Sequence, residues 1–99
     1  MPTLKVDLQE GFSGETVVLR LNGQEVYRQA VKTRTQIGLA DSRSFDLPPQ
    51  HLKLEAALPQ SSVSEALELD LSQDMYVGVT LSSHDVLSLH ASSEPFGYA

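Results

Sequence analysis

The chain has 99 residues, which suffice for one domain with one modest core, and its 40% hydrophobic and 20% charged content is typical of a globular chain. With 6% aromatic residues and no tryptophan, we expect an aliphatic core. The absence of cysteine excludes disulfides, thiolate metal sites and cysteine nucleophiles, and a formal net charge of -6 argues against a general nucleic-acid binder.

The N-terminal residues predict a short, half-buried strand, in which Leu4, Val6 and Leu8 alternate with polar residues. They lack the basic start and apolar run of a signal peptide, and no segment approaches the roughly 18–20 apolar residues of a membrane span. We therefore expect a cytoplasmic protein with no membrane contact. A turn with two glycines follows, and Phe12 between them is expected to cap one end of the core.

The strongest local signal is a β-hairpin centred on Asn22-Gly23, since Asn-Gly accepts the positive φ angles of a two-residue type I′ turn. A regular register gives three cross-strand pairs: Arg20–Glu25, Leu19–Val26 and Val18–Tyr27.

The strand after this turn, from Gln24 to about Val31, is less regular because Arg28 falls at an inward position. Either a bulge shifts the phase after Tyr27, or Arg28 lies at the rim of the sheet. Residues 32–35 then form a loop or an edge strand protected by charge.

The middle of the chain alternates between loop and strand signals. Ile37 and Leu39 flank Gly38, which suggests close packing of another backbone or a bulge. Residues 41–44 are a loop by composition, and Pro48-Pro49 cannot lie in a central strand. Residues 51–58 form a regular strand whose inward face is Leu52, Leu54, Ala56 and Leu58.

The second half predicts further strands at residues 63–71, 75–81 and 85–91. A helix is a rival in the first of these, but leucines at 67, 69 and 71 follow the two-residue period of a strand. The fold class is therefore all-β: a single antiparallel β-sandwich of seven or eight strands, immunoglobulin-like or transthyretin-like, over residues 1–91. The predicted common core is Leu19, Val26, Leu52, Leu54, Leu69, Val77 and Val79.

The tail, residues 92–99, carries two of the six aromatic residues, Phe96 and Tyr98. A disordered tail usually lacks aromatic residues. We expect these two either to fold back onto an open end or edge of the sandwich, or to contact a partner.

No catalytic residue, cofactor or metal site is predicted. His84 and His90 are six residues apart on one strand, roughly 20 Å at about 3.3 Å per residue, which is too far for one ion. Ser83, His84 and Asp85 are neighbours in sequence, and adjacent side chains at a strand end point in different directions. Nothing matches a calcium loop, a glycine-rich phosphate loop or a nucleophile elbow.

Charge is unevenly distributed along the chain. Residues 16–45 carry five basic and two acidic side chains, whereas residues 46–99 carry eight acidic side chains and only Lys53. Faces of opposite sign are one interpretation, and simply solvated strand faces are the other. The candidate interaction residues are Tyr27, Arg28, Lys32, Arg34, Phe96 and Tyr98.

Residues 16–58 resemble PEGA-type and other transthyretin-like sandwich modules. The resemblance is carried by Asn22-Gly23 in the hairpin and by Leu47-Pro48 followed by residues 51–54, HLKL. The usual second Gly-x-x-Pro segment is missing between them. Such modules are generally non-catalytic, so the resemblance implies an adhesion, spacer or interaction domain without an active site.

These observations favour a non-catalytic module that binds another protein or a second copy of itself, and not nucleic acid. The alternative is a module for carbohydrate or another small ligand, with Tyr27 and Tyr76 as aromatic contacts.

Overall fold

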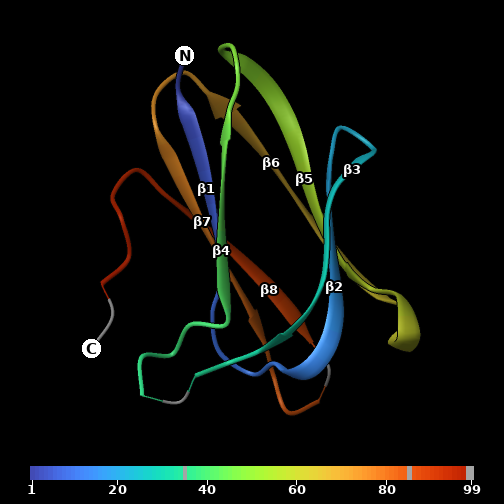
Figure 1. Cartoon of the computed structure of the whole chain (residues 1–99). Coiled ribbons are helices and arrows are strands. Elements are labelled where there is room, and N and C mark those ends of the chain that lie inside the picture. Colours follow the sequence, from blue (N-terminus) through green and yellow to red (C-terminus); the bar gives the residue numbers. More distant parts are fainter. Residues whose placement is uncertain (35, 85, 98–99) are drawn as a thin grey trace.

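The computed structural model of the chain describes residues 1–34, 36–84 and 86–97. Over these residues the chain forms eight strands and one short 3-10 helix, η1 (Figure 1). Their bounds are β1 Thr3–Leu8, β2 Ser13–Leu21, β3 Gln24–Lys32, β4 Asp41–Asp46, β5 Gln50–Leu58, η1 Pro59–Ser61, β6 Val63–Leu71, β7 Met75–Leu81 and β8 Leu87–Ser92.

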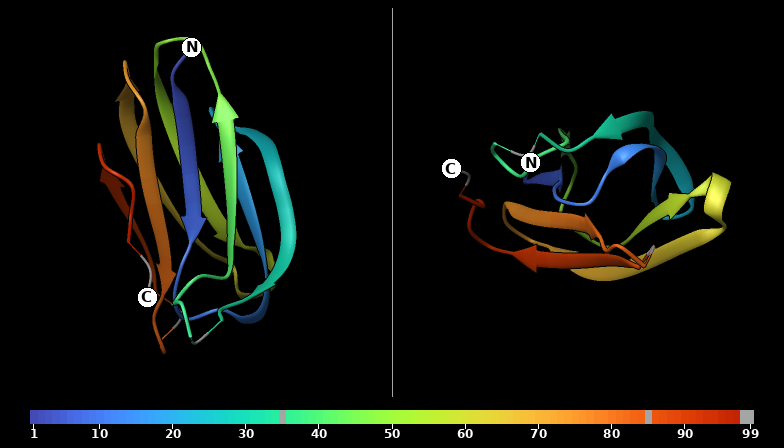
Figure 2. Two further views of the ribbon diagram at one scale, coloured as in Figure 1. Left: turned by 60° about the vertical axis from the view of Figure 1, so that its left-hand side comes forward. Right: turned by 90° about the horizontal axis from the view of Figure 1, so that it is seen from below.

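The strands form two four-stranded sheets that face each other, which confirms the predicted all-β, sandwich-like architecture (Figure 2). The strand order is β4-β1-β7-β8 in the β1 sheet and β3-β2-β5-β6 in the β2 sheet. Edge strands β3 and β4 lie along one side of the sandwich, where the Tyr27 hydroxyl on β3 donates to Asp41 on β4. Edge strands β6 and β8 lie along the opposite side. We refer to these sides as the β3/β4 margin, which includes the connection 33–40, and the β6/β8 margin.

One strand pairing departs from the predicted antiparallel arrangement. β1 is antiparallel to β4 but parallel to β7, with Val6 beside Val77. Antiparallel neighbours can be joined by a short hairpin turn, which has a recognisable sequence. Parallel neighbours need a long connection, which has no such local signal. Most of the chain lies between β1 and β7, so no local signal in the sequence could reveal their pairing.

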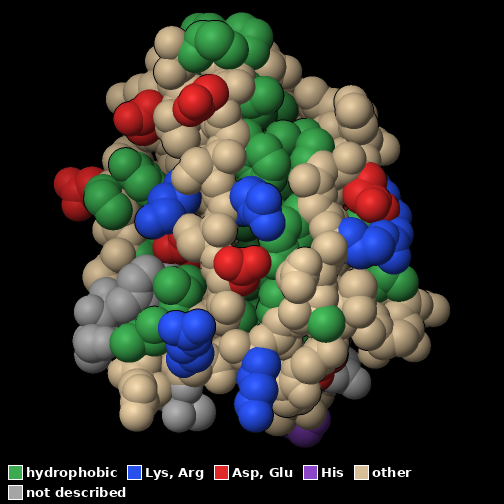
Figure 3. Space-filling model, viewed as in Figure 1, with side chains coloured by type: hydrophobic (Ala, Val, Ile, Leu, Met, Phe, Trp, Pro, Cys, Tyr) green, Lys and Arg blue, Asp and Glu red, His purple; other side chains and the backbone are tan. Residues whose placement is uncertain are grey.

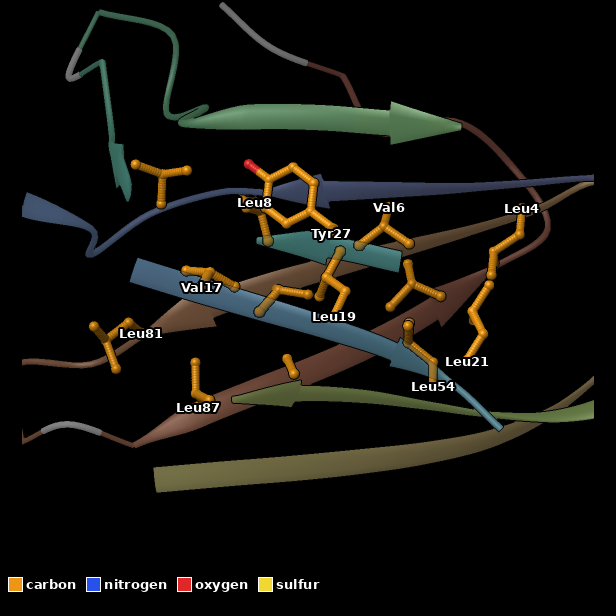
Figure 4. Close-up of a cluster of buried hydrophobic side chains, with 14 of the residues drawn as sticks. Leu4, Val6, Leu8, Val17, Leu19, Leu21, Tyr27, Leu54, Leu81 and Leu87 are labelled. Atoms are coloured by element: carbon orange, nitrogen blue, oxygen red, sulfur yellow. The ribbon is translucent and has the colours of Figure 1, made fainter. Parts of the chain in front are cut away.

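The core lies between the sheets and consists mainly of aliphatic side chains from their inward faces (Figure 4). Phe12 is also buried in this cluster, at 3% exposure. Val26 packs against the cluster but is only partly buried. The other six predicted core residues are all buried in it: Leu19, Leu52, Leu54, Leu69, Val77 and Val79.

The β2–β3 hairpin has the predicted turn but not the predicted register. Asn22 and Gly23 have φ angles of 51° and 85°, as a type I′ turn requires. Arg20 pairs with Glu25, but the register then shifts by one residue, so the predicted Leu19–Val26 and Val18–Tyr27 pairs are wrong. The observed pairs beyond the shift are Leu19–Tyr27 and Val18–Arg28.

The bulge therefore lies at Val26, before Tyr27 and not after it. Its effect is to keep the side-chain pattern of β3 compatible with burial. Tyr27 and Val31 take the inward positions, where they are 6% and 5% exposed, and Arg28 takes an outward one. A regular register would place the Arg28 charge against the core, which costs several kcal/mol without a partner.

We expect Gly23→Val to lower the free energy of unfolding by about 1–3 kcal/mol, because a β-branched residue is strained at positive φ. An added Cβ at Gly23 meets no atom within 4 Å, so the effect isolates the backbone term. Urea unfolding of the variant beside Gly23→Asn, whose side chain tolerates this region, provides the measurement. Equal stability of the valine and asparagine variants would contradict the turn assignment.

Residues 41–44 belong to strand β4 and not to the predicted loop. β4 pairs with β1 along its whole length, from Leu8–Asp41 to Leu4–Phe45 and beyond. Because Asp41 and Arg43 stand opposite inward-facing leucine and valine, they lie on the inner side of an edge strand. These two charges give the segment the composition of a loop although it is an edge strand.

The segment around Gly38 also differs from the expectation of a strand-like alternation. Residues 36–38 form a turn closed by a bridge between Arg34 and Leu39, and the Gly38 N–H donates to Arg34 O at 2.8 Å. The atoms nearest to a Cβ added at Gly38 belong to the Glu10 side chain, with Oε1 at 3.3 Å, and not to another backbone as the sequence suggested.

Candidate interaction surface

Four cations gather on the β3/β4 margin. Arg28 and Lys32 lie on β3, Arg34 lies in the connection, and Arg43 lies on β4, and all four are exposed. Figure 3 shows lysine and arginine side chains spread over this side of the molecule. The fifth basic residue of this half, Arg20, lies elsewhere and pairs with Glu55 at 3.6 Å.

The acidic residues of β6 lie at the opposite margin of the same sheet. Glu65, Glu68 and Asp70 are exposed there. Arg28 and Lys32 on β3 and the three acidic residues on β6 therefore lie at the two opposite edges of the β2 sheet. Of the two interpretations of the charge asymmetry, opposite faces and solvated strand faces, this arrangement is not that of opposite faces.

The four cations differ in how far they are neutralised. Arg28 donates to both carboxylate oxygens of Glu25, from Nη2 at 2.8 Å and from Nε at 3.3 Å. This contact lowers the pKa of Glu25 and raises the pKa of Arg28. No carboxylate of a described residue lies within 4.0 Å of the charged nitrogens of Lys32, Arg34 or Arg43. Three positive charges on this margin are therefore available to a partner.

Tyr27 links the two sheets and is not an exposed contact residue. Its side chain belongs to the buried cluster, as Figure 4 shows, and its hydroxyl donates to Asp41 Oδ2 at 2.5 Å. Burial, with this hydrogen bond, raises the pKa of Tyr27, so the hydroxyl stays protonated and remains the donor. The Arg43 guanidinium carbon lies 5.1 Å from the ring centroid, within the range of a cation–π contact. Tyr27 is thus a buried residue that contacts Asp41 and Arg43 on β4.

A strip of apolar side chains is visible between the strands of this margin (Figure 3). Val26, Phe45 and Leu47 are half-buried and pack against the core. At the end of the strip is a concavity of about 240 Å³, with Leu21, Val26, Leu47 and Leu52 among its lining. Its remaining lining residues are the carboxamides Asn22, Gln24 and Gln50. An apolar floor with a polar and cationic surround is the composition of many protein interfaces.

Of the two tail residues, Phe96 is described, and it is not part of this margin. Phe96 is half-buried in the segment after β8, which lies on the other side of the sandwich from β3 (Figures 1 and 2). The turn that starts this segment is held by Ser92, whose hydroxyl donates to Glu94 O and accepts from Glu94 N–H. Tyr98 lies outside the described residues. Of the six predicted interaction residues, the structure therefore brings together Arg28, Lys32 and Arg34.

The sequence missed two contributors to the margin for identifiable reasons. Arg43 was assigned to a loop, so nothing linked it to the cations of β3. Val26 was assigned to the core, and only the bulge, which has no distinct sequence signal, moves it to the edge. The sequence Pro48-Pro49 predicts that a strand ends near Leu47, but it does not predict that Leu47 lies in an apolar strip.

Among the described residues, the histidines and tyrosines do not form joint sites. His51 lies on β5, His84 after β7 and His90 on β8, and no group of described residues has the three ligands needed to hold a metal ion. Asp85 lies outside the described residues. Tyr27 points between the sheets, whereas Tyr76 pairs with Lys5 on the outer face of the β1 sheet, so they form no common aromatic platform.

His51 lies between two carboxylates on the outer face of the β2 sheet. Its Nδ1 lies 2.6 Å from Asp70 Oδ1 and its Nε2 lies 3.2 Å from Glu68 Oε1. The hydrogen bond to Asp70 and then that to Glu68 raise the pKa of His51 above its ordinary value.

We expect this cluster to make stability depend on pH. The pKa of His51 is higher in the folded state than in the unfolded state. The contribution of His51 to stability is therefore complete below its unfolded-state pKa and is lost as pH rises through its folded-state pKa. The stability difference between wild type and His51→Gln, measured by urea unfolding, should therefore be larger at pH 5.5 than at pH 9. In the Glu68→Gln/Asp70→Asn background, replacing His51 by glutamine should change stability equally at the two pH values. A difference that grew with pH would contradict the assignment.

The described part of the chain contains no helix that is long and apolar enough to cross a membrane. No protein-family model matches the chain, and neither the curated proteins nor the solved structures include a significant match.

Proposed function

We propose that this chain is a non-catalytic interaction module that binds another protein through the β3/β4 margin. The observation that carries the proposal is the gathering of Lys32, Arg34 and Arg43, without carboxylate partners among the described residues, beside a half-buried apolar strip. A protein interface combines such a strip, which loses water on binding, with charges that select and orient the partner.

The resemblance to PEGA-type and transthyretin-like modules supports the same reading, because those modules generally act as interaction or spacer domains. The proposal includes a sandwich of the transthyretin-like or immunoglobulin-like type. It also includes a cytoplasmic location. A cytoplasmic location suits a small domain without cysteine, since secreted domains of this size commonly contain disulfides.

The test compares two variants with equal net charge. Lys32→Gln/Arg34→Gln removes two positive charges from the margin, whereas Ser64→Glu/Ser72→Glu adds two negative charges at exposed positions of β6 and the turn after it. Immobilised wild-type protein and both variants are incubated with an extract of the cells that naturally contain this protein. The captured proteins are quantified by mass spectrometry.

We expect a protein captured by the wild type and the serine variant to be reduced at least tenfold with the Lys32→Gln/Arg34→Gln variant. Equal capture by all three, or a loss confined to the serine variant, would contradict the proposal. Titration with oligosaccharides tests the alternative, a carbohydrate-binding module, which requires saturable binding without a protein partner.

A further inference from the structure

The outer edge of β4 offers backbone hydrogen bonds at a definite position. Among the described strands, β4 pairs with β1 alone. The Leu47 N–H donates to Pro2 O at 3.1 Å, which continues the register beyond the Thr3–Asp46 pair. Bonding alternates along an antiparallel pair, so the N–H groups of Phe45 and Arg43 point towards β1 and those of Ser42 and Ser44 point away.

Only part of this edge is open. The Ser42 N–H donates to Asp41 Oδ1 at 2.8 Å, so the side chain of the preceding residue covers the start of the strand. The Ser44 N–H is directed to the open half of the edge, next to Phe45 and Leu47. The open half of the backbone edge therefore coincides with the apolar strip.

A strand added to this edge would extend the β1 sheet towards β3 and cover the strip. Beyond Asp41, which the Tyr27 hydroxyl contacts, the inward-facing residues of β4 are Arg43 and Phe45, two positions apart. The residues opposite them on an added strand would also be two positions apart and on one face. The one facing Phe45, with Val26 and Leu47 near it, would gain from being aliphatic, and the one facing Arg43 from being acidic.

The local charge supports this choice of partner. Arg43 has no carboxylate within 4.0 Å among the described residues, and the nearby Asp41 already accepts hydrogen bonds from Tyr27 and Ser42. Lys32 and Arg34 add positive charge along the same margin. A basic segment would meet like charges at Arg43, Lys32 and Arg34, whereas an acidic one would meet opposite charges at these three positions.

We propose that the open half of β4 binds an extended segment of a partner protein in which an aliphatic and an acidic residue alternate with small polar residues, by addition of that segment as a strand. This inference rests on the proposed function, because it specifies the partner of the same margin. The aliphatic side chain covers Val26 and Leu47, the acidic side chain contacts Arg43, and a backbone carbonyl accepts from Ser44 N–H.

The test uses a nine-residue peptide with blocked ends, of sequence SESLSLSES, which reads the same in both directions and so serves either strand orientation. Its control, SKSLSLSKS, has the same aliphatic content and the opposite charge. Each is titrated into the ¹⁵N-labelled full chain, and amide shifts are followed by NMR. We expect saturable shifts centred on residues 43–47 and on Val26, and at least tenfold weaker binding of the lysine peptide.

Two variants test the contacts. Ser44→Pro removes the open-edge N–H and should weaken binding at least tenfold, whereas Ser44→Ala keeps it and should bind as the wild type does. Arg43→Gln should bind the glutamate peptide and the lysine peptide with nearly equal affinity. This variant tests the proposal even if Ser44→Pro does not fold.

Three results would overturn the inference: no saturable shift, equal binding of the two peptides to the wild type, or shifts centred on the β6/β8 margin. If partner capture still depends on Lys32 and Arg34 while the peptide does not bind, the strand-addition inference fails and the proposed function stands. If that capture is also independent of the two cations, both fail.

Discussion

Replacing Gly11 by alanine is expected to be the most damaging single-methyl change in this chain. Gly11 has φ of 98°, and a Cβ built on it would lie 1.6 Å from Leu81 O and 2.6 Å from Leu81 C. Both atoms are backbone, so no side chain can move aside. The Leu81 N–H donates to Glu10 O at 2.9 Å, and moving the turn away would break this hydrogen bond between β7 and the turn after β1.

We expect Gly11→Ala to lower the free energy of unfolding by about 4 kcal/mol or more, which is the range of exceptional single substitutions. Gly14→Ala is the matched control. Gly14 also has positive φ, at 114°, but nothing lies within 4 Å of its added Cβ, so only backbone strain of about 1–3 kcal/mol applies. Urea unfolding followed by circular dichroism measures both. Similar losses for the two variants would contradict the described contact between this turn and β7.

Truncation of Leu54 to alanine is expected to cost about 2–5 kcal/mol, as for other fully buried leucines. Leu54 is 0% exposed on β5, which lies inside the β2 sheet between β2 and β6. Its neighbours in the register are Leu21 and Leu67. Because strands surround it and the second sheet covers it, the cavity cannot collapse without moving the backbone.

Leu67→Ala provides the comparison for this prediction. Leu67 is directly opposite Leu54 on edge strand β6, but it is only partly buried. The same truncation should therefore cost less there, because less apolar surface is lost and water can enter the site. A Leu54→Ala loss below about 1 kcal/mol, or a larger loss for Leu67→Ala, would show that the core is not centred between these sheets.

The parts of the fold that could be predicted are those with local signals. The Asn22-Gly23 turn follows from the φ preferences of its two residues, and the inward face of residues 51–58 follows from strict alternation. The strand at Val63–Leu71 was distinguished from a helix by leucines spaced two apart, which the structure confirms.

The features that could not be predicted depend on tertiary context. The bulge at Val26 exists because Arg28 must avoid the core while Tyr27 and Val31 enter it, a requirement that spans the whole of β3. β4 was hidden because an edge strand with inward-facing Asp41 and Arg43 has the composition of a loop. The parallel pairing of β1 with β7 has no connecting turn at all.

The candidate surface was predictable in the same partial way. The cluster of positive charge in one half of the chain indicated Arg28, Lys32 and Arg34, and their shared strand and connection keep them close. Arg43 joins them only because β4 crosses to the same margin as β3, which is a property of the strand order. Aromatic content indicated Tyr27, but its hydroxyl is used inside the protein, in the bond to Asp41.

Binding of a protein to the β3/β4 margin can be observed by NMR of the ¹⁵N-labelled chain in an extract of the cells that naturally contain it. Compared with buffer at equal viscosity, we expect the amide signals of residues 26–34 and 41–47 to shift or broaden, while those of β6 keep their positions. Unchanged spectra, or changes confined to the β6/β8 margin, would contradict the claim.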